Sequence, residues 1–513
     1  MRATVTEDAR FLAWAVGAKP GEGYRGGHSD ERLLKLCFDH RVAGRLLARL
    51  KDSRPDWASD ALLAGLEEQQ AENLKLVKMH SAAFKAIRDR YLTHGEKIIS
   101  MKGLACFAYT GNPDHVRRTL DIDILVDDPE TLAAAMRADK VTEYRNVSPH
   151  EIINARIEGV GIDLHAHYPI WSLDGDAAAW QGRGREQGDA ILHRGELQVS
   201  PLTFDDLADQ AFSAGVFGVE GVHVPDPSIA VLIICAHCFR DFMSFSSITV
   251  RAKPTLKLGD LAEMGDYLSQ PGFSPQRLLA FAHKTHATQA VRWMARILLQ
   301  LTGDDRLATA LGASASSEED FFSQFPRAVW GGFFARLPDS FENFIAGKIP
   351  TAQVVSALGG LPIDAQGEGR ISIEATGAPT SPGGNTHILD RPNTAAPAAI
   401  SIRRDDRDIA VVVEGETLSR GPNTRVHIDI AGYPWEWNWD RSADRVTAKK
   451  SIHVPEPRTV FEKTPSGFRL EYHMDPTLLD LPENGEIPGL VGVGEFEHTP
   501  VMRAGTLVPF VIR

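Results

Sequence analysis

The sequence is poor in cysteine and lacks a recognisable leader. Cys37, Cys106, Cys235 and Cys238 are the four cysteines among 513 residues, which is too few for a disulfide framework in a chain of this length. The first residues contain neither the basic region nor the apolar region of a secretory signal. We therefore expect a reducing, cytoplasmic compartment.

Excess basic charge and long apolar runs are also missing. Lysine and arginine total 55 against 68 aspartates and glutamates, a net charge of −13, which argues against a large basic groove for nucleic acid. A membrane helix needs about 18 to 20 apolar residues, and the nearest candidate, residues 227–239, is shorter and contains His237. We interpret it as a buried helix, and we expect neither a membrane nor a nucleic acid among the partners.

The rest of the composition is that of a folded protein, and the spacing of apolar residues changes along the chain. At about 150 residues per domain, the length of 513 residues predicts about three domains. Apolar residues at three- and four-residue spacing indicate helices, alternating ones indicate strands, and Gly-, Pro- and Thr-rich sequence indicates a linker. The predicted fold class is a multidomain α+β protein. Its parts are a helical N-terminal region (1–92), an α/β core (93–200), a helical domain (201–345), a linker (346–399) and a β-sandwich (400–513).

The α/β core contains a pattern of carboxylates. In residues 119–128 apolar side chains alternate with aspartates, so Asp121 and Asp123 share one face of a strand, about 7 Å apart at the backbone. Asp163, on a second alternating segment, is the natural third carboxylate. Carboxylates suit hard cations, and two such ions can activate an attacking oxygen and stabilise a departing pyrophosphate. The alternative is that these aspartates serve turns or caps, as strand-end aspartates often do.

With their neighbours, these residues resemble a known family. The motifs are similar to those of the uncharacterised nucleotidyltransferase family within the DNA polymerase β superfamily, over roughly residues 30–300. They are Met101-Lys102-Gly103, Arg117 four positions before Asp121-Ile122-Asp123-Ile124-Leu125-Val126, Ile162-Asp163-Leu164-His165, Leu232 to His237, and Leu258-Gly259-Asp260-Leu261.

The resemblance implies a polymerase β-like core and an enzyme that uses an NTP as co-substrate with Mg²⁺ or Mn²⁺ as cofactor. It implies that Asp121 and Asp123 bind both metal ions. It also implies that Asp163 binds the catalytic ion and helps to deprotonate the acceptor hydroxyl.

The resemblance also implies a nucleotide-binding set. Gly103 would let backbone amides approach the phosphates, and Lys102 and Arg117 would be cationic neighbours of the triphosphate. Two departures concern this set. Leu104 follows Gly103 where the superfamily commonly has serine or glycine, and Arg118-Thr119 stands where the family often has proline and glycine.

Several histidines and one further aspartate are candidates for supporting contacts. His165 and His167 share a strand face with Asp163, which could indicate a histidine metal site, but the surrounding oxygen ligands favour Mg²⁺ over zinc. We therefore expect His165 to support the ligands or to pack. His237 and Asp260 are further supporting candidates, Asp260 either by holding a residue of the core or by capping a helix.

The C-terminal region carries three tryptophans at alternate positions. Trp435, Trp437 and Trp439 would line one strand face, either as an exposed platform for sugar rings or as part of a sandwich core. Residues 425–429 and 464–472 faintly resemble family 9 carbohydrate-binding modules. The sandwich is therefore a candidate ligand-binding domain.

Two function classes follow. The first is a metal-dependent nucleotidyltransferase that moves a nucleoside monophosphate from an NTP to an acceptor hydroxyl, with the sandwich recognising the acceptor. The acceptor class stays open among a small molecule, a glycan, a peptide and a protein. The alternative is a non-catalytic binding or scaffold protein with a pseudo-nucleotidyltransferase core and a glycan- or protein-binding sandwich.

Overall fold

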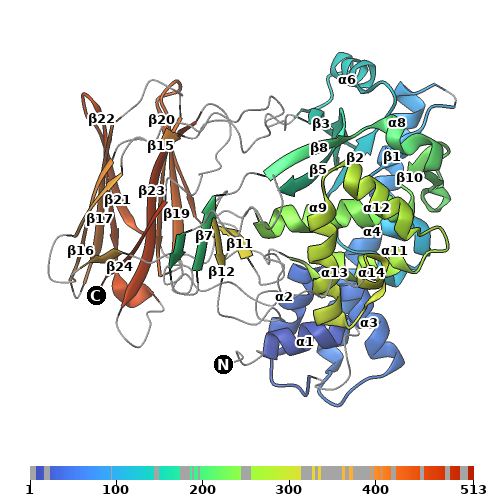
Figure 1. Cartoon of the computed structure of the whole chain (residues 1–513), viewed down its shortest axis with the longest axis horizontal. Helices are drawn as coiled ribbons and strands as arrows, with labels where there is room; N and C mark the ends of the chain where they lie inside the picture. The colour runs from blue at the N-terminus through green and yellow to red at the C-terminus, as the bar shows by residue number, and fades with distance from the viewer. Residues whose placement is uncertain are drawn as a thin grey trace.

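The computed structural model contains helices, a mixed sheet and antiparallel sheets, as the predicted fold class requires. It describes residues 7–16, 24–93, 95–143, 150–173, 185–187, 190–194, 197–243, 256–312, 326–329, 333–336, 361–363, 369–373, 394–395, 398–405, 407–416, 423–431, 433–450, 456–479, 486–496 and 507–512. The helices and the mixed sheet lie together on the right of Figure 1, and the C-terminal strands form a separate β-rich lobe on the left.

The N-terminal region is helical, as its periodicity predicts. Its helices are α1 (Glu7–Ala15), α2 (Asp30–His40), α3 (Ala43–Asp52) and α4 (Asp60–Tyr91). Ser29 and Ser59 precede α2 and α4, and each side chain accepts a hydrogen bond from a backbone N–H of the first helical turn. A serine cap of this kind satisfies an N–H group that has no partner within the helix.

Among the described residues, six strands form the mixed sheet of the core, in the order β3-β4-β2-β1-β10-β9. β2 runs parallel to β4 and antiparallel to β1, and β10 runs parallel to β1. The strands are β1 (Ile98–Ser100), β2 (Asp121–Leu125), β3 (Glu151–Ile157), β4 (Val160–His165), β9 (Phe212–Ser213) and β10 (Val222–Val224).

The two faces of β2 and β4 differ in character because side chains alternate along a strand. The even-numbered residues, which include Ile122, Ile124 and Ile162, are buried against α4 and α6 (Pro129–Ala138). The odd-numbered positions of β2 and β4 carry the aspartates. The helix α5 (Ala105–Thr110) follows β1, and the short helix η2 (Pro113–His115) precedes β2.

A second group of helices covers the remaining core. Helix α9 is apolar around its whole circumference and packs against β5 and three other helices, so residues 227–239 form the buried helix that was expected. No helix in the described part of the chain is both long enough and apolar enough to cross a membrane. The helices are α8 (Phe204–Leu207), η3 (Ala208–Gln210), η4 (Gly215–Phe217), α9 (Pro227–Met243), α11 (Leu258–Leu268), α12 (Pro275–Lys284), α13 (Thr288–Thr302) and α14 (Arg306–Ala310).

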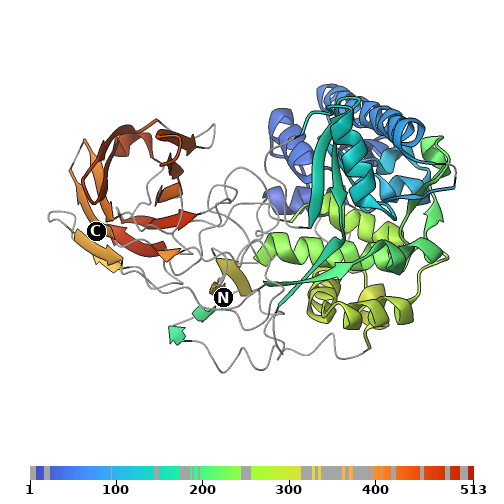
Figure 2. The ribbon, with the colours of Figure 1, turned by 90° about the horizontal axis from the view of Figure 1, so that it is seen from above.

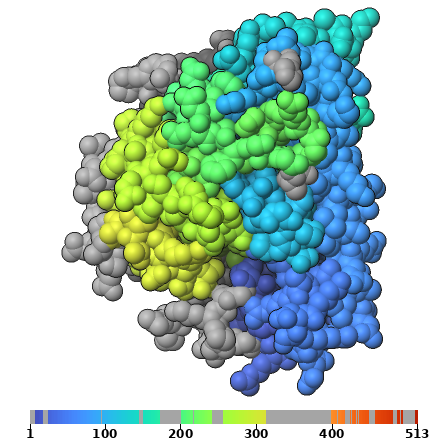
Figure 3. All heavy atoms as spheres, turned by 90° about the vertical axis from the view of Figure 1, so that its right-hand side faces the viewer, coloured from blue at the N-terminus to red at the C-terminus, as the bar shows by residue number. Residues whose placement is uncertain are grey.

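The N-terminal helices and this second group lie side by side on the face drawn in Figure 3. Arg45 of α3 pairs with Asp266 of α11. The thiol of Cys106 donates to the same carboxylate over 3.2 Å. All four cysteines are buried and unlinked.

Two smaller sheets are also described, and β5 and β11 of these sheets pack against α9. β5 (Tyr168–Leu173) pairs with β8 (Leu197–Leu202), and β7 lies between β6 and β12 in a sheet that ends at β11. The bounds of the latter strands are β6 (Arg185–Gln187), β7 (Ala190–Arg194), β11 (Pro326–Val329) and β12 (Phe333–Arg336).

The C-terminal lobe consists of two sheets around one apolar core (Figure 2). One sheet has the order β13-β24-β23-β18-β19-β20, with β15 paired to β23, and the other has the order β14-β16-β17-β22-β21. The strands are β13 (Leu361–Ile363), β14 (Gly369–Ile373), β15 (Thr394–Ala395), β16 (Ala398–Arg404), β17 (Ile409–Glu416), β18 (Asn423–Ile430), β19 (Tyr433–Asp440), β20 (Arg445–Lys450), β21 (Arg458–Lys463), β22 (Gly467–Met474), β23 (Ile487–Phe496) and β24 (Leu507–Ile512), with the short helix η7 (Pro476–Leu478).

Three of these strands lie in the range where the sequence predicts a linker. β13, β14 and β15 pair with β24, β16 and β23. The physical reason is that an edge strand offers unpaired backbone groups to any neighbouring extended segment. The rest of residues 346–399, apart from the start of β16, lies outside the described residues.

Candidate active site

The three expected carboxylates meet on one face of the mixed sheet. In the parallel pair of β2 and β4, Asp123 lies beside Asp163, and Asp121 lies beside Gly161. Because residues two apart on a strand share a face, Asp121 points to the same side as the other two. The backbone N–H of Met101 donates to the carbonyl of Asp123 over 3.0 Å, which brings the Lys102-Gly103 turn to this end of the sheet.

Asp123 is the buried member of the set, 4% exposed. Lys102 Nζ lies 3.2 Å from its Oδ2, and His165 Nε2 lies 3.0 Å from its Oδ1. Burial by itself would raise the pKa of Asp123, but the Lys102 ammonium and the His165 hydrogen bond outweigh it and hold the pKa well below its usual range. Asp123 is therefore a carboxylate with fixed orientation.

Asp163 has the opposite electrostatic character. Burial and the charge of Asp123 raise its pKa to about 6, although the amide of Asn154 donates to Oδ1 over 2.5 Å and opposes the change. Two carboxylates in adjacent register repel each other, and the less well paired one is the easier to protonate. The face is therefore crowded with negative charge.

Gly103 occupies a conformation and a space that other residues would not tolerate. Its φ is +73°, in the left-handed region, and a Cβ built on it would lie 2.7 Å from Thr119 Cγ2. The residue lies between β1 and α5, so the chain can turn closely past the segment that leads into β2. Glycine at this position lets the backbone approach other groups.

Arg117 is placed differently from Lys102. It is 7% exposed, its Nε donates to Glu263 Oε1 over 2.6 Å, and its Nη2 lies 3.4 Å from Asp260 Oδ1. Both carboxylates belong to α11. The guanidinium is thus held inside the protein by two acidic side chains, and it anchors the segment before β2 to the second group of helices.

Of the two remaining supporting candidates, Asp260 lies beside Arg117, and His237, on α9, interacts electrostatically with Asp260. Asp260 is 5% exposed, and although burial would raise its pKa, the charges of Arg117, Lys257, Arg41 and His237 lower it. Asp260 therefore holds a residue of the core, one of the two roles considered for it.

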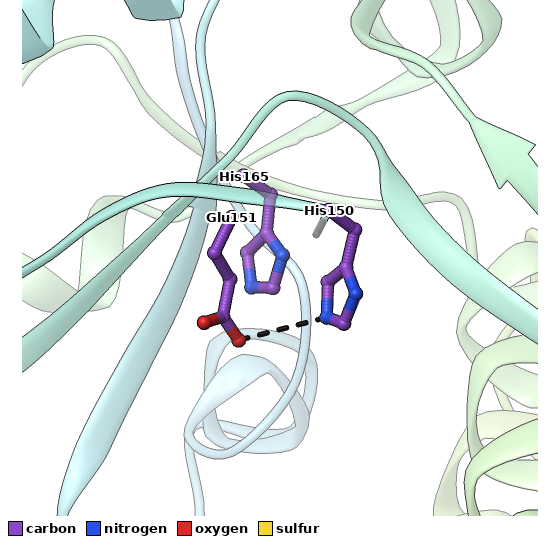
Figure 4. Close-up of side chains that lie close together, drawn as sticks. All are labelled: His150, Glu151 and His165. Atoms are coloured by element: carbon purple, nitrogen blue, oxygen red, sulfur yellow. Dashed lines mark ion pairs between the residues drawn. The ribbon is translucent and has the colours of Figure 1, made fainter. Parts of the chain in front are cut away.

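Several polar residues at the site were not among the residues predicted from the sequence. Asn154 and Glu151 come from β3, His150 directly precedes that strand, and Glu263 comes from α11. His150, Glu151 and His165 each offer one potential ligand atom, and these atoms lie within 4.8 Å of one another (Figure 4). The alternation of polar residues in β3 was a weak signal for Asn154, whereas nothing local connects His150 to His165.

The tryptophans of β19 face the interior of the C-terminal lobe. Trp435 is 2% exposed and lies edge-to-face against Tyr472, with 4.8 Å between ring centroids. Trp437 and Trp439 are half-buried and pack against Phe461. All three belong to, or pack against, the apolar core shared by the two sheets.

Comparison with known proteins adds a family and one partial relative. The model of a family described as uncharacterised nucleotidyltransferase matches residues 27–303, more than half of the chain. A nonribosomal peptide synthetase, ungA', from Aspergillus campestris is 30% identical over 102 residues. That match covers 19% of this chain and spans 1% of the length of the synthetase, so it bears on one segment of the chain.

Proposed function

We propose, because the chain belongs to the uncharacterised nucleotidyltransferase family, that it transfers a nucleoside monophosphate from an NTP to an acceptor hydroxyl and releases pyrophosphate. The observation that carries this proposal is the register of β2 and β4, with Asp123 beside Asp163 and Asp121 two residues away on the same face. This arrangement offers three carboxylates to one small volume.

The donor set fits a hard divalent cation, Mg²⁺ or Mn²⁺. Asp121, Asp123 and Asp163 supply only oxygen ligands, which such ions prefer. The raised pKa of Asp163, caused by burial and by the charge of Asp123, is the sign of negative charge that a cation would compensate. When bound, the ions would supply Lewis-acid activation of the acceptor oxygen and would neutralise charge on the departing pyrophosphate.

The protein's own residues have distinct roles in this proposal. Asp163, held by Asn154, takes the proton of the acceptor hydroxyl. Lys102, a quarter exposed, directs its ammonium to Asp123 and to the phosphates. Gly103 keeps the turn beside them free of a side chain that would meet Thr119.

The C-terminal lobe is the part of the chain to which we assign recognition of the acceptor. We propose that its β-sheets recognise or present an acceptor that is a small molecule, a glycan, a peptide or a protein. Since the three tryptophans pack on the core of this lobe, recognition through other surfaces of the lobe is the version that we favour.

Isothermal titration with each of the four ribonucleoside triphosphates, with and without Mg²⁺, tests the donor site. The Asp121→Ala, Asp123→Ala double variant should lose Mg²⁺-dependent binding of the triphosphate that the wild type binds. Asp127→Ala removes an exposed aspartate just after the same strand and should bind like the wild type. Circular dichroism would verify that each variant is folded.

Two results would contradict the proposal. One is binding by the double variant that equals that of the wild type. The other is a wild type that binds no triphosphate, which would favour the scaffold alternative. If binding is found, Asp163→Asn should retain the triphosphate but lose transfer to the acceptor, measured by mass spectrometry of the products.

A further inference from the structure

A cluster of two imidazoles and one carboxylate, from residues other than the three aspartates, lies next to the aspartate site. His150, Glu151 and His165 lie side by side in Figure 4, and one potential ligand atom of each lies within 4.8 Å of the others. His150 and His165 are 5% and 2% exposed. His150 Nε2 lies 3.5 Å from Glu151 Oε1, and Glu151 lies opposite His165 in the pairing of β3 and β4.

The hydrogen bond of His165 determines which of its nitrogens can bind a ligand. Asp123 is paired with the Lys102 ammonium at 3.2 Å, so its oxygens are acceptors, and the nitrogen 3.0 Å away, Nε2, must carry the proton. Nδ1 is the ring nitrogen that remains for another ligand. Among the described residues, this buried Nδ1 has no hydrogen-bond partner.

A buried acceptor without a donor is costly. A histidine that donates one ring N–H to a carboxylate and offers its other nitrogen is also the usual form of a metal-binding histidine in proteins. Asp123 fixes the tautomer and the ring orientation of His165 in this way. The two imidazole rings are stacked, with 5.3 Å between centroids and 8° between planes, so the His150 ring must turn before both rings can direct a nitrogen at one ion.

The donor set differs from that of the three aspartates. Two imidazoles and one carboxylate are a set found in zinc sites, whereas the aspartates offer only oxygen. We propose that His150, Glu151 and His165 bind a borderline divalent transition-metal ion, Zn²⁺, at a site separate from that of Asp121, Asp123 and Asp163. The two sites are joined through the hydrogen bond between His165 and Asp123, so an ion at the histidine site stabilises the orientation of Asp123. The proposal of this zinc site does not depend on the proposed nucleotidyltransferase function.

The test is equilibrium binding of Zn²⁺ to the full chain in excess Mg²⁺, which competes at the oxygen site. We expect one equivalent of Zn²⁺ for the wild type. His150→Ala and the more conservative Glu151→Gln should weaken binding by at least about tenfold. His223→Ala, which removes a half-buried histidine from β10 of the same sheet, and Asp121→Ala should bind Zn²⁺ like the wild type.

Co²⁺ gives a second readout, because its visible absorption reports nitrogen ligands. The spectrum of the wild type should be lost in His150→Ala, which removes a nitrogen ligand, and kept in Asp121→Ala. The proposal is overturned if the wild type binds no Zn²⁺, if binding survives both substitutions in the cluster, or if Asp121→Ala abolishes it. Equal loss in His223→Ala would also overturn it, since the ion would then not be specific to the cluster.

Discussion

Arg117 and Glu263 are 146 residues apart in the sequence, yet Arg117 Nε donates to Glu263 Oε1 over 2.6 Å in the interior of the protein. Asp260, one turn earlier on α11, lies 3.4 Å from the same guanidinium. Because Asp121 follows Arg117 by four residues, these contacts anchor the chain just before the strand that carries the carboxylates. The position of β2 thus depends on a helix that is far away in the sequence.

Replacing Arg117 should therefore reduce stability strongly. Arg117→Met leaves two buried carboxylates without their main cation, and we expect the free energy of unfolding to fall by about 3 to 5 kcal/mol. Arg118→Ala is the neighbouring control, because Arg118 packs over the ring of Phe38 and should cost less than about 1 kcal/mol. Urea denaturation measures both. A stable Arg117→Met protein with weakened triphosphate binding would instead support the phosphate-binding role implied by the family resemblance.

Alanine substitutions at Gly103 and Gly111 can distinguish backbone strain from steric overlap as causes of lost stability. Gly103→Ala meets Thr119 Cγ2 and adopts a φ of +73°, whereas Gly111→Ala has a φ of +59° with no described atom within 4 Å of the new Cβ. Both pay about 1 to 2 kcal/mol for the left-handed conformation, so the excess loss in Gly103→Ala reports the overlap. Thr119→Ser removes Cγ2 and should recover part of that excess. Additive losses in the double variant would contradict this explanation.

Substitutions of Lys102 and Asp121 should affect different properties. The change at Lys102 should lower folding stability, and the change at Asp121 should weaken triphosphate binding. Lys102→Met removes the cation beside the buried Asp123 and should cost on the order of 3 kcal/mol. Asp121 is exposed, so Asp121→Asn should leave Tm unchanged while weakening Mg²⁺-dependent triphosphate binding. Differential scanning fluorimetry and titration calorimetry provide the two measurements. A large Tm decrease in Asp121→Asn would show that this aspartate has a structural role.

Two buried histidines should make the protein sensitive to acid. Burial, with the charge of Lys257, lowers the pKa of His40 to about 3, and burial lowers that of His80 to about 4. Each stays neutral in the folded protein but gains a proton below about pH 6.5 in the unfolded chain. Stability is then complete above that pH and falls as the pH decreases, by about 2 kcal/mol per histidine between pH 7 and 5.

The contribution of His40 can be isolated by substitution. His40→Gln should reduce the dependence of the unfolding free energy on pH over this range, whatever its effect at pH 7. His283→Gln, at an exposed position of α12, should retain the dependence of the wild type. An unchanged slope in His40→Gln would mean that other groups cause the acid sensitivity.

Trp435 should behave as a core residue of the C-terminal lobe. It is 2% exposed and packs on Tyr472, so Trp435→Ala should cost about 3 to 5 kcal/mol. Val460→Ala, at a residue that is 42% exposed in the same lobe, should change stability little. Glycan-array binding measured in parallel tests the platform hypothesis, which predicts loss of a ligand with little loss of stability.

Local patterns were sufficient for much of the fold. The three- and four-residue spacing of apolar side chains in residues 1–92 indicates helices, because a helix face is a short-range feature. Alternation in β2 placed Asp121 and Asp123 on one face. Local composition does not indicate β13, β14 and β15, which lie in the range predicted as a linker, since these short strands are defined by the sheets that they join.

The sequence by itself determined which residues alternate and which could bind hard cations, because both depend on residue types and on neighbours within a few positions. Only the tertiary structure decided that Asp123 lies beside Asp163, that Arg117 is paired inside the protein, and that Glu151 meets His165. The last contact depends on a shift of register between Glu151 and Ile153. Pairing between strands and helices that are distant in sequence is set by the packing of the whole core, and no local pattern contains it.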